Sequence, residues 1–300
     1  MKRLLLPGAA FALAQLLILT VDAKPAGRPA IIGLSHICFQ VEDLEKSTTF
    51  FHALLGYDEP FKRSKDASGF ETAYFKINDR QYVELHGGLK GDREDAWAHL
   101  AYETTDAEAM RRFLAGKGVA VPDKITTDAI GNLCFTVRDF EGRLLEFTQY
   151  LPGSLLMKSN GESLPSRRLS ERMFHAGMPV IDLEEATRFY QDILGFTEML
   201  RSHKDRTPTW INWKVPEAGA YIEWNLMDKA SDRRKISMRY HFGLSVPDVQ
   251  ATAETLRKRA ADLGQTMDGF PNVGLNNRWQ IGVFDPDGRR QELMEPYTMR

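Results

Sequence analysis

VEDLEKSTTFFHALLGY at residues 41–57 and VIDLEEATRFYQDILGF at residues 180–196 are two copies of one pattern, aligned without a gap at an offset of 139 positions. Each copy contains an Asp suited to capping a helix, then an amphipathic stretch, then a Gly after the last turn (Asp43 and Gly56; Asp182 and Gly195). Each copy therefore predicts a strand end followed by a helix. We expect a new strand directly after the Gly, over residues 57–61 and 196–200.

Two weaker copies follow the strong ones. HLAYETTD at residues 99–106 opens a predicted helix that runs to about Lys117, and HFGLSVPD at residues 241–248 opens one that runs to about Asp262. Similar turns, DFEG at 139–142 and DPDG at 285–288, precede the last strand of each half. The chain thus consists of four units of roughly fifty residues, each a strand, a helix and further strands.

The units fall into two domains of an α+β fold. The stretch 152–172 is rich in Ser, Pro, Gly and Arg, which is typical of a linker. We therefore predict one domain at residues 30–151 and a second at 173–300.

Each unit begins with a His and ends with a Glu. The spacing from His to Glu is 48 positions in units one and three, 47 in unit two and 51 in unit four. One such His is usually structural, and one such Glu usually faces solvent. The same order in four consecutive units instead indicates two metal centres, with the ligands His36, Glu84, His99 and Glu146 in the first domain and His175, Glu223, His241 and Glu292 in the second.

Strand alternation supports this interpretation. Val83 and Leu85 flank Glu84, and Ile222 and Trp224 flank Glu223, so each carboxylate points to the face opposite its apolar neighbours. An unpaired carboxylate inside the protein would cost several kcal/mol, so it needs a cation or another partner. Two imidazoles with two carboxylates suit Ni, Co, Zn, Mn or Fe, with up to two ions per chain.

This combination of motifs resembles the vicinal oxygen chelate superfamily, also called the glyoxalase/bleomycin-resistance/extradiol-dioxygenase superfamily. The resemblance covers about residues 31–150 and 173–297 and implies four βαβββ modules forming two glyoxalase-like domains. It also implies a metal in the cleft shared by two modules. Modules could pair in order along the chain, across domains or across chains, and the sequence leaves this open, together with a homodimer.

The resemblance further implies chemistry. Members chelate two adjacent oxygens of a small substrate, and in the glyoxalase I branch the last Glu can move a proton, which makes Glu146 and Glu292 the candidate catalytic residues. We therefore expect a metal-dependent lyase or isomerase. The alternatives are an extradiol-type Fe/Mn dioxygenase and a ligand-binding protein without catalysis. The ring-cleaving branch carries a Tyr where this chain has Gly282, and no His follows His241.

The second domain carries several aromatic residues near its predicted ligands, most of which we interpret as core. Tyr221 and Asn225 share strand parity with Glu223 and are therefore the residues that we expect to line a substrate pocket.

Bulk properties restrict the partners and the location. A formal net charge of −2 gives no electrostatic reason to expect nucleic acid or an anionic membrane. Residues 1–23 combine Lys2 and Arg3, an apolar run and small residues before Lys24, the order of a secretory signal peptide. An uncleaved membrane anchor is the alternative, which Pro7 and Gln15 disfavour. We expect a secreted or periplasmic protein, free of the membrane after cleavage. That location argues against a glutathione-derived substrate. Cys38 and Cys134 are expected to be buried thiols, although pairing stays an alternative.

Overall fold

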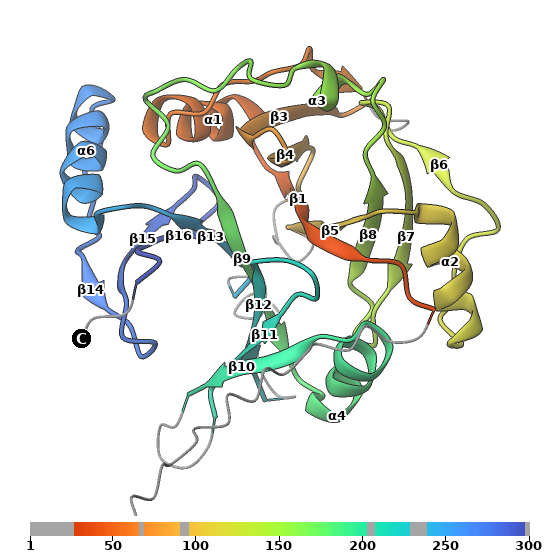
Figure 1. The fold of residues 1–300 in the computed structure, drawn as a ribbon. Coiled ribbons are helices and arrows are strands. Elements are labelled where there is room, and N and C mark those ends of the chain that lie inside the picture. The colour runs from red at the N-terminus through yellow and green to blue at the C-terminus, as the bar shows by residue number, and fades with distance from the viewer. Residues whose placement is uncertain (1–26, 66–68, 91–95, 203–207, 229–238, 298–300) are drawn as a thin grey trace, which may run out of the picture.

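The fold consists of two curled sheets of eight strands each, with few helices (Figure 1). The structure is a computed structural model, and it describes residues 27–65, 69–90, 96–202, 208–228 and 239–297. The signal peptide predicted for residues 1–23 lies outside the described residues.

The first sheet is built from the first two sequence units. Its elements are β1 (Ile31–Val41), α1 (Leu44–Thr49), η1 (Phe50–Leu54), β2 (Ser64–Lys65), β3 (Glu71–Asn78), β4 (Gln81–Gly87), β5 (Trp97–Thr104), α2 (Ala107–Gly116), β6 (Thr126–Thr127), β7 (Leu133–Arg138) and β8 (Leu144–Gln149). A short helix, α3 (Leu155–Lys158), follows in the linker.

The second sheet repeats this plan. Its elements are β9 (Met173–Val180), α4 (Leu183–Ala186), η2 (Thr187–Ile193), β10 (Thr197–Arg201), β11 (Trp210–Lys214), β12 (Tyr221–Leu226), β13 (His241–Ser245), α6 (Val249–Asp262), β14 (Asn272–Val273), β15 (Trp279–Phe284) and β16 (Arg290–Met294).

Consecutive modules share a sheet, so the modules pair in order along the chain. The strand orders are β2-β3-β4-β1-β5-β8-β7-β6 and β10-β11-β12-β9-β13-β16-β15-β14. In each sheet the first strands of the two modules run antiparallel at the centre, and each has the last strand of its own module as a parallel neighbour. The four strands that carry the predicted ligands are therefore adjacent in each sheet.

The helices begin where the sequence predicts. Asp43, Asp106, Asp182 and Asp248 each accept hydrogen bonds from backbone N–H groups of the first turn. The repeated pattern of residues 41–57 and 180–196, however, is only partly α-helical. The second half of each helix is a π-helix, with i to i+5 bonds from Leu55 N to Phe50 O and from Leu194 N to Phe189 O.

The strand expected at residues 57–61 is absent, and this expectation was wrong. The matching strand of the second domain, β10, does form. In the first domain the linker packs against this segment instead: Leu169 N donates to Leu55 O, and the Tyr57 hydroxyl donates to the carbonyl of Ser170. Tertiary contacts with the linker replace strand pairing at this position.

Strand alternation separates the core from the metal-ligand face. Ile37 and Phe39 of β1 are buried in the main apolar core, while His36 and Cys38 point to the opposite side of the same strand. That core is continuous between the domains, because Phe39 packs against Phe242 with ring centroids 6.2 Å apart. Both cysteines are buried and unpaired, as predicted.

The last turn of each domain also forms a hydrogen bond with the other domain. Arg143 forms an ion pair with Asp139 and donates to the carbonyl of Pro179 at the end of β9. Arg289 repeats the arrangement with Asp285 and the carbonyl of Gln40 at the end of β1. The two DxxG turns of the sequence therefore hold the domains together reciprocally.

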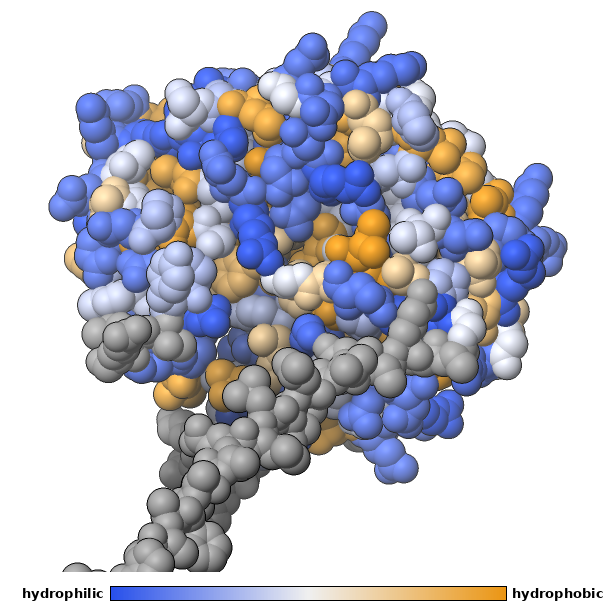
Figure 2. Space-filling view, viewed as in Figure 1, coloured by the Kyte–Doolittle hydropathy of each residue, from blue (hydrophilic) through white to orange (hydrophobic). Residues whose placement is uncertain are grey.

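On the face shown in Figure 2, polar residues predominate and apolar residues form small separate groups. Among the described residues, no helix combines the length and the apolar character that a membrane span requires.

Candidate metal centres

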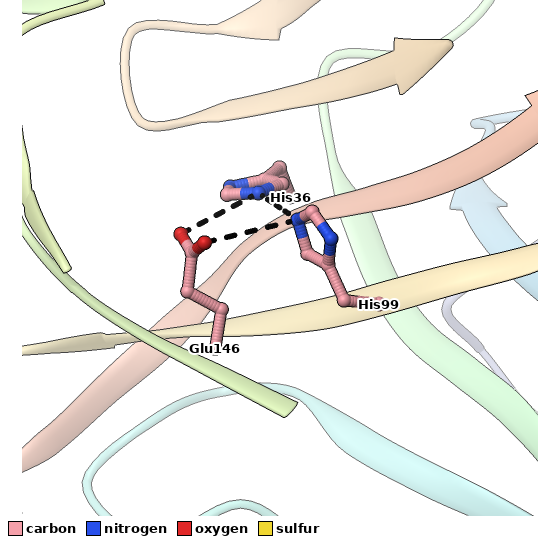
Figure 3. Close-up of side chains that lie close together, drawn as sticks. All are labelled: His36, His99 and Glu146. Carbon is pink, nitrogen blue, oxygen red and sulfur yellow. Dashed lines mark hydrogen bonds and ion pairs between the residues drawn. The ribbon is translucent and has the colours of Figure 1, made fainter. Parts of the chain in front are cut away.

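The structure brings the four predicted ligands of the first domain together. His36 comes from β1, Glu84 from β4, His99 from β5 and Glu146 from β8. Figure 3 shows His36, His99 and Glu146 pointing toward one another. We call this group of four residues centre 1.

The distances within centre 1 are short. The Nε2 atoms of His36 and His99 lie 2.8 Å apart. Glu84 Oε2 lies 3.4 Å from Nε2 of His36 and 3.7 Å from Nε2 of His99, while the carboxylate of Glu146 lies 3.7 Å and 4.0 Å from the same two atoms. Four donor atoms thus surround one small space.

The second domain holds an equivalent group, which we call centre 2. His175 comes from β9, Glu223 from β12, His241 from β13 and Glu292 from β16. Nε2 of His175 lies 3.3 Å from Glu292, and Nε2 of His241 lies 3.6 Å from Glu223 and 4.0 Å from Glu292.

Centre 2 contains polar atoms that lack a hydrogen bond. His175 and His241 are buried, yet neither nitrogen of His175 nor Nε2 of His241 makes one within the described part of the chain. Nδ1 of His241 donates to the carbonyl of Arg239 at 2.9 Å, so that Nε2 keeps its lone pair for another partner. Buried polar atoms of this kind normally have a partner. An ion bound in centre 2 would satisfy the two Nε2 atoms, which face its carboxylates.

Two glycines make room for the imidazoles of centre 2. Gly177 lies opposite His241 across β9 and β13, and Gly243 lies opposite His175. A Cβ atom at either glycine would overlap the facing imidazole ring. Cys38 and Ala101 take the corresponding places in centre 1.

A tyrosine stacks on one imidazole in each centre. Tyr82 lies 4.4 Å from the ring of His36 at an interplanar angle of 17°, and Tyr221 lies 4.9 Å from the ring of His175 at 13°. Tyr221, expected to line a substrate pocket, therefore lies against a predicted ligand. Tyr82 was missed by the sequence analysis, although it shares strand parity with Glu84 as Tyr221 does with Glu223.

The residue two positions after the first Glu also contacts it. Asn225, the second expected pocket residue, donates to Glu223 Oε1 at 3.4 Å. In the first domain His86 takes this position, with Nε2 3.0 Å from Glu84 Oε1. His86 was not among the predicted site residues, and its strand parity with Glu84 is the signal that could have identified it.

Burial keeps the imidazoles in the form that binds a metal. Burial, followed by the charge of His99, lowers the pKa of His36 to about 3. Burial likewise lowers the pKa of His99 and brings that of His241 to about 4. These imidazoles are therefore neutral at neutral pH, as metal coordination requires.

The two carboxylates of each centre differ in acidity. In centre 1, burial and then the charge of Glu84 raise the pKa of Glu146 to about 8. Burial alone would raise the pKa of Glu84, but its hydrogen bond with His86 and the nearby imidazoles lower it to about 2. In centre 2 the first Glu, not the last, has the raised pKa. Burial and the charge of Glu292 raise the pKa of Glu223 to about 8. His241 and His175 keep the pKa of Glu292 low despite its burial.

The residues present fit a divalent transition metal. Each centre offers two imidazoles and two carboxyl groups, and three of the four residues in each (His36, His99 and Glu146; His175, His241 and Glu292) place donor atoms within 4.8 Å of one another. Such a set of nitrogen and oxygen donors suits Ni, Co, Zn, Mn or Fe.

Comparison with known proteins agrees with this geometry. Two family models, both described as the Glyoxalase/Bleomycin resistance protein/Dioxygenase superfamily, match residues 35–135 and 172–293, and together they cover well over half of the chain. The chain belongs to this superfamily. As a member with two such domains, it is a tandem vicinal oxygen chelate protein.

One curated relative is a lactoylglutathione lyase of Haemophilus influenzae, 27% identical over 132 residues, which are 41% of this chain and 92% of that protein. Among solved structures, a variant of homoprotocatechuate 2,3-dioxygenase from B. fuscum is similar with a TM-score of 0.69 and 18% identity, over 93% of this chain and 76% of that one. The 2,3-dioxygenase LapB from Pseudomonas sp. KL28 is similar with a TM-score of 0.61 and 14% identity, over 89% of this chain and 96% of its own. At these identities the structural matches describe the fold.

Proposed function

We propose that this protein is a metal-dependent lyase or isomerase of the glyoxalase I-like type, acting on a small substrate that binds the metal through two adjacent oxygens. The observation that carries the proposal is the set of two imidazoles and two carboxylates around one space in both domains. Four protein donors are what the glyoxalase I branch of the superfamily uses, whereas the ring-cleaving branch typically uses two His and one Glu.

A divalent ion held in either centre would supply a Lewis acid that stabilises an enolate-like anion of the substrate. The chain itself must move the proton. Glu146 and Glu292 are the last ligands of the two centres, and in this proposal each accepts a proton from the carbon next to a substrate carbonyl and returns it to the neighbouring carbon. Tyr82 and Tyr221 hold one imidazole of each centre in place by stacking.

An extradiol-type dioxygenase is the second candidate, because solved enzymes of that class share this fold over nearly the whole chain. Gly282 argues against it. Gly282 pairs with Glu292 across β15 and β16, and it offers no phenol beside centre 2, where the resemblance places a Tyr in ring-cleaving enzymes. A ligand-binding protein without catalysis is the third candidate, and the presence of all eight predicted ligands disfavours it.

The substrate class follows from the site and from the proposed location. The name of the Haemophilus relative describes a glutathione-derived substrate. Export of this chain, which stays a prediction from residues 1–23, would separate it from the cytosolic glutathione pool. We therefore favour a small hydroxycarbonyl or dicarbonyl compound over a glutathione adduct.

The test compares the two reactions on one preparation. Protein loaded with Ni²⁺, Co²⁺ or Zn²⁺ is incubated in D₂O with dihydroxyacetone or with the glutathione hemithioacetal of methylglyoxal, and NMR follows deuterium at the carbon next to the carbonyl. Protein loaded with Fe²⁺ or Mn²⁺ is incubated with catechol while oxygen uptake is recorded. Glu146→Gln and Glu292→Gln single and double variants accompany the wild type.

Deuterium incorporation that the double variant lowers by at least about 10²-fold would support the proposal, because this variant loses both general bases and, with them, one ligand of each metal. Oxygen uptake with catechol and no deuterium incorporation would contradict the proposal and indicate a dioxygenase. Metal binding with neither reaction would favour a ligand-binding protein.

A further inference from the structure

Glu84 lies between two different sets of donors. Its Oε2 atom faces Nε2 of His36 at 3.4 Å and Nε2 of His99 at 3.7 Å, inside centre 1. Its Oε1 atom faces Nε2 of His86 at 3.0 Å. One carboxylate therefore serves centre 1 with one oxygen and leaves the other oxygen beside a third imidazole.

A thiol completes this second set. Cys38 is the Cα partner of Glu84 across β1 and β4, and it points to the same side of the sheet as His36. Cys38, Glu84 and His86 each place a donor atom within 4.8 Å of the other two, so they form a group separate from the three residues drawn in Figure 3.

The second domain shows what this position looks like without the extra donors. Gly177 stands where the first domain has Cys38, and Asn225 stands where it has His86. There the amide of Asn225 takes the place of the His86 imidazole, with Nδ2 3.4 Å from Oε1 of Glu223. The carboxylate is present in both domains, but Gly177 and Asn225 of the second domain supply neither a thiol nor an imidazole.

We propose that Cys38, Glu84 and His86 form a further metal site beside centre 1, with Glu84 shared between the two positions. The first domain then binds two ions and the second domain binds one.

The donor types define which ion the site takes. A thiolate, an imidazole and a carboxylate oxygen are ligands of Zn²⁺ and of its spectroscopic substitute Co²⁺, whereas Mg²⁺ and Ca²⁺ prefer oxygen alone. The thiol must release its proton to solvent when the ion binds. Access is available from the side of His86, whose side chain is 25% exposed, while that of Glu84 is 13% exposed. The inference goes beyond the proposed function, because neither Cys38 nor His86 has a part in the proposed proton transfer.

Cobalt binding to the purified full chain tests the proposal. Metal-free protein is titrated with Co²⁺, and metal content after dialysis is measured together with the near-ultraviolet absorption of a thiolate-to-cobalt charge transfer. The variants are Cys38→Ala, Cys38→Ser and His86→Asn, the last of which introduces the residue that the second domain carries. Cys134→Ala is the matched control, because it removes the other buried thiol of the same domain.

We expect about three equivalents of Co²⁺ and a charge-transfer band in the wild type, and about two equivalents without the band in the Cys38 variants. His86→Asn should also retain about two equivalents, and Cys134→Ala should behave as the wild type. The wild-type band does not depend on any variant folding, and circular dichroism identifies a variant that fails to fold.

About two equivalents in the wild type with no thiolate band would overturn this inference while leaving centres 1 and 2 in place. A band that Cys134→Ala removes and Cys38→Ala retains would also overturn it. A chain that binds no Co²⁺ at all would contradict the proposed function as well, so the two failures are distinguishable.

Discussion

Gly177 lies directly beneath the imidazole of His241. The two residues are Cα partners across β9 and β13, and a Cβ atom added at Gly177 would overlap Cε1 of the ring. The ring can occupy its place in centre 2 only because position 177 has no side chain.

Gly177→Ala should therefore weaken metal binding in the second domain. The methyl group must push the His241 ring away from Glu223 and Glu292, and misplacing a ligand in this way typically costs about 10–100-fold in affinity. Competition with a chromophoric chelator measures the change. Gly153→Ala is the control, since a Cβ at position 153 meets no atom within 4 Å. Unchanged affinity in Gly177→Ala would contradict the requirement for a glycine beneath the His241 ring.

Removal of one carboxylate should remove one ion. Glu146→Gln should lower the metal content of the chain by about one equivalent, and Glu292→Gln should do the same independently, because their centres lie in different domains. Elemental analysis after dialysis checks this. Glu254→Gln, an exposed position on α6, should leave the content unchanged. If Glu146→Gln and Glu292→Gln both retained the full content, the ions would be held elsewhere.

Loss of Arg143 should destabilise the contact between the domains. Arg143→Met leaves the buried carboxylate of Asp139 without its cation and the carbonyl of Pro179 without its donor. Breaking a buried pair from one side costs about 3 kcal/mol. Urea unfolding measures the change, with exposed Arg138→Met as a control expected to fall within about 0.5 kcal/mol of the wild type. Equal stability of the two variants would contradict the structural role given to this turn.

The stabilising effect of Asp79 should depend on pH. Asp79 pairs with buried Lys76 at 2.8 Å and accepts from Gly161 N, which ties the linker to the hairpin of β3 and β4. Burial acts to raise the pKa of Asp79, but the hydrogen bonds from Lys76 and Gly161 outweigh it and lower the pKa below the usual 3.8. An ionised Asp79 therefore stabilises the fold at pH values above the unfolded pKa, and this contribution is lost as pH falls through the folded pKa.

Asp79→Asn should accordingly unfold at lower urea concentration than the wild type at pH 7. The difference between the two midpoints should shrink as the pH is lowered below about 4. Asp123→Asn, in an exposed position before β6, should show no such trend. A midpoint difference that stays constant from pH 7 to pH 3 would show that the charge of Asp79 has no part in stability.

The metal ligands were accessible from sequence because the chain repeats itself. A lone His36 or Glu84 carries little information, but the same order in four units, with regular spacing, identifies the type of centre and the strands that bear it. Alternation along a strand then places each Glu opposite its apolar neighbours without knowledge of the fold.

Contacts between distant segments were decided by the tertiary structure alone. Sequence could not show that β1 pairs with β5 of the next module, that the turn of Arg143 reaches Pro179, or that the linker displaces the strand expected after Gly56. Nor could it show that Tyr221 stacks on His175, or that Glu84 divides its two oxygens between centre 1 and His86. The physical reason is that strand periodicity fixes which way a side chain points, whereas sheet order and packing fix what it meets.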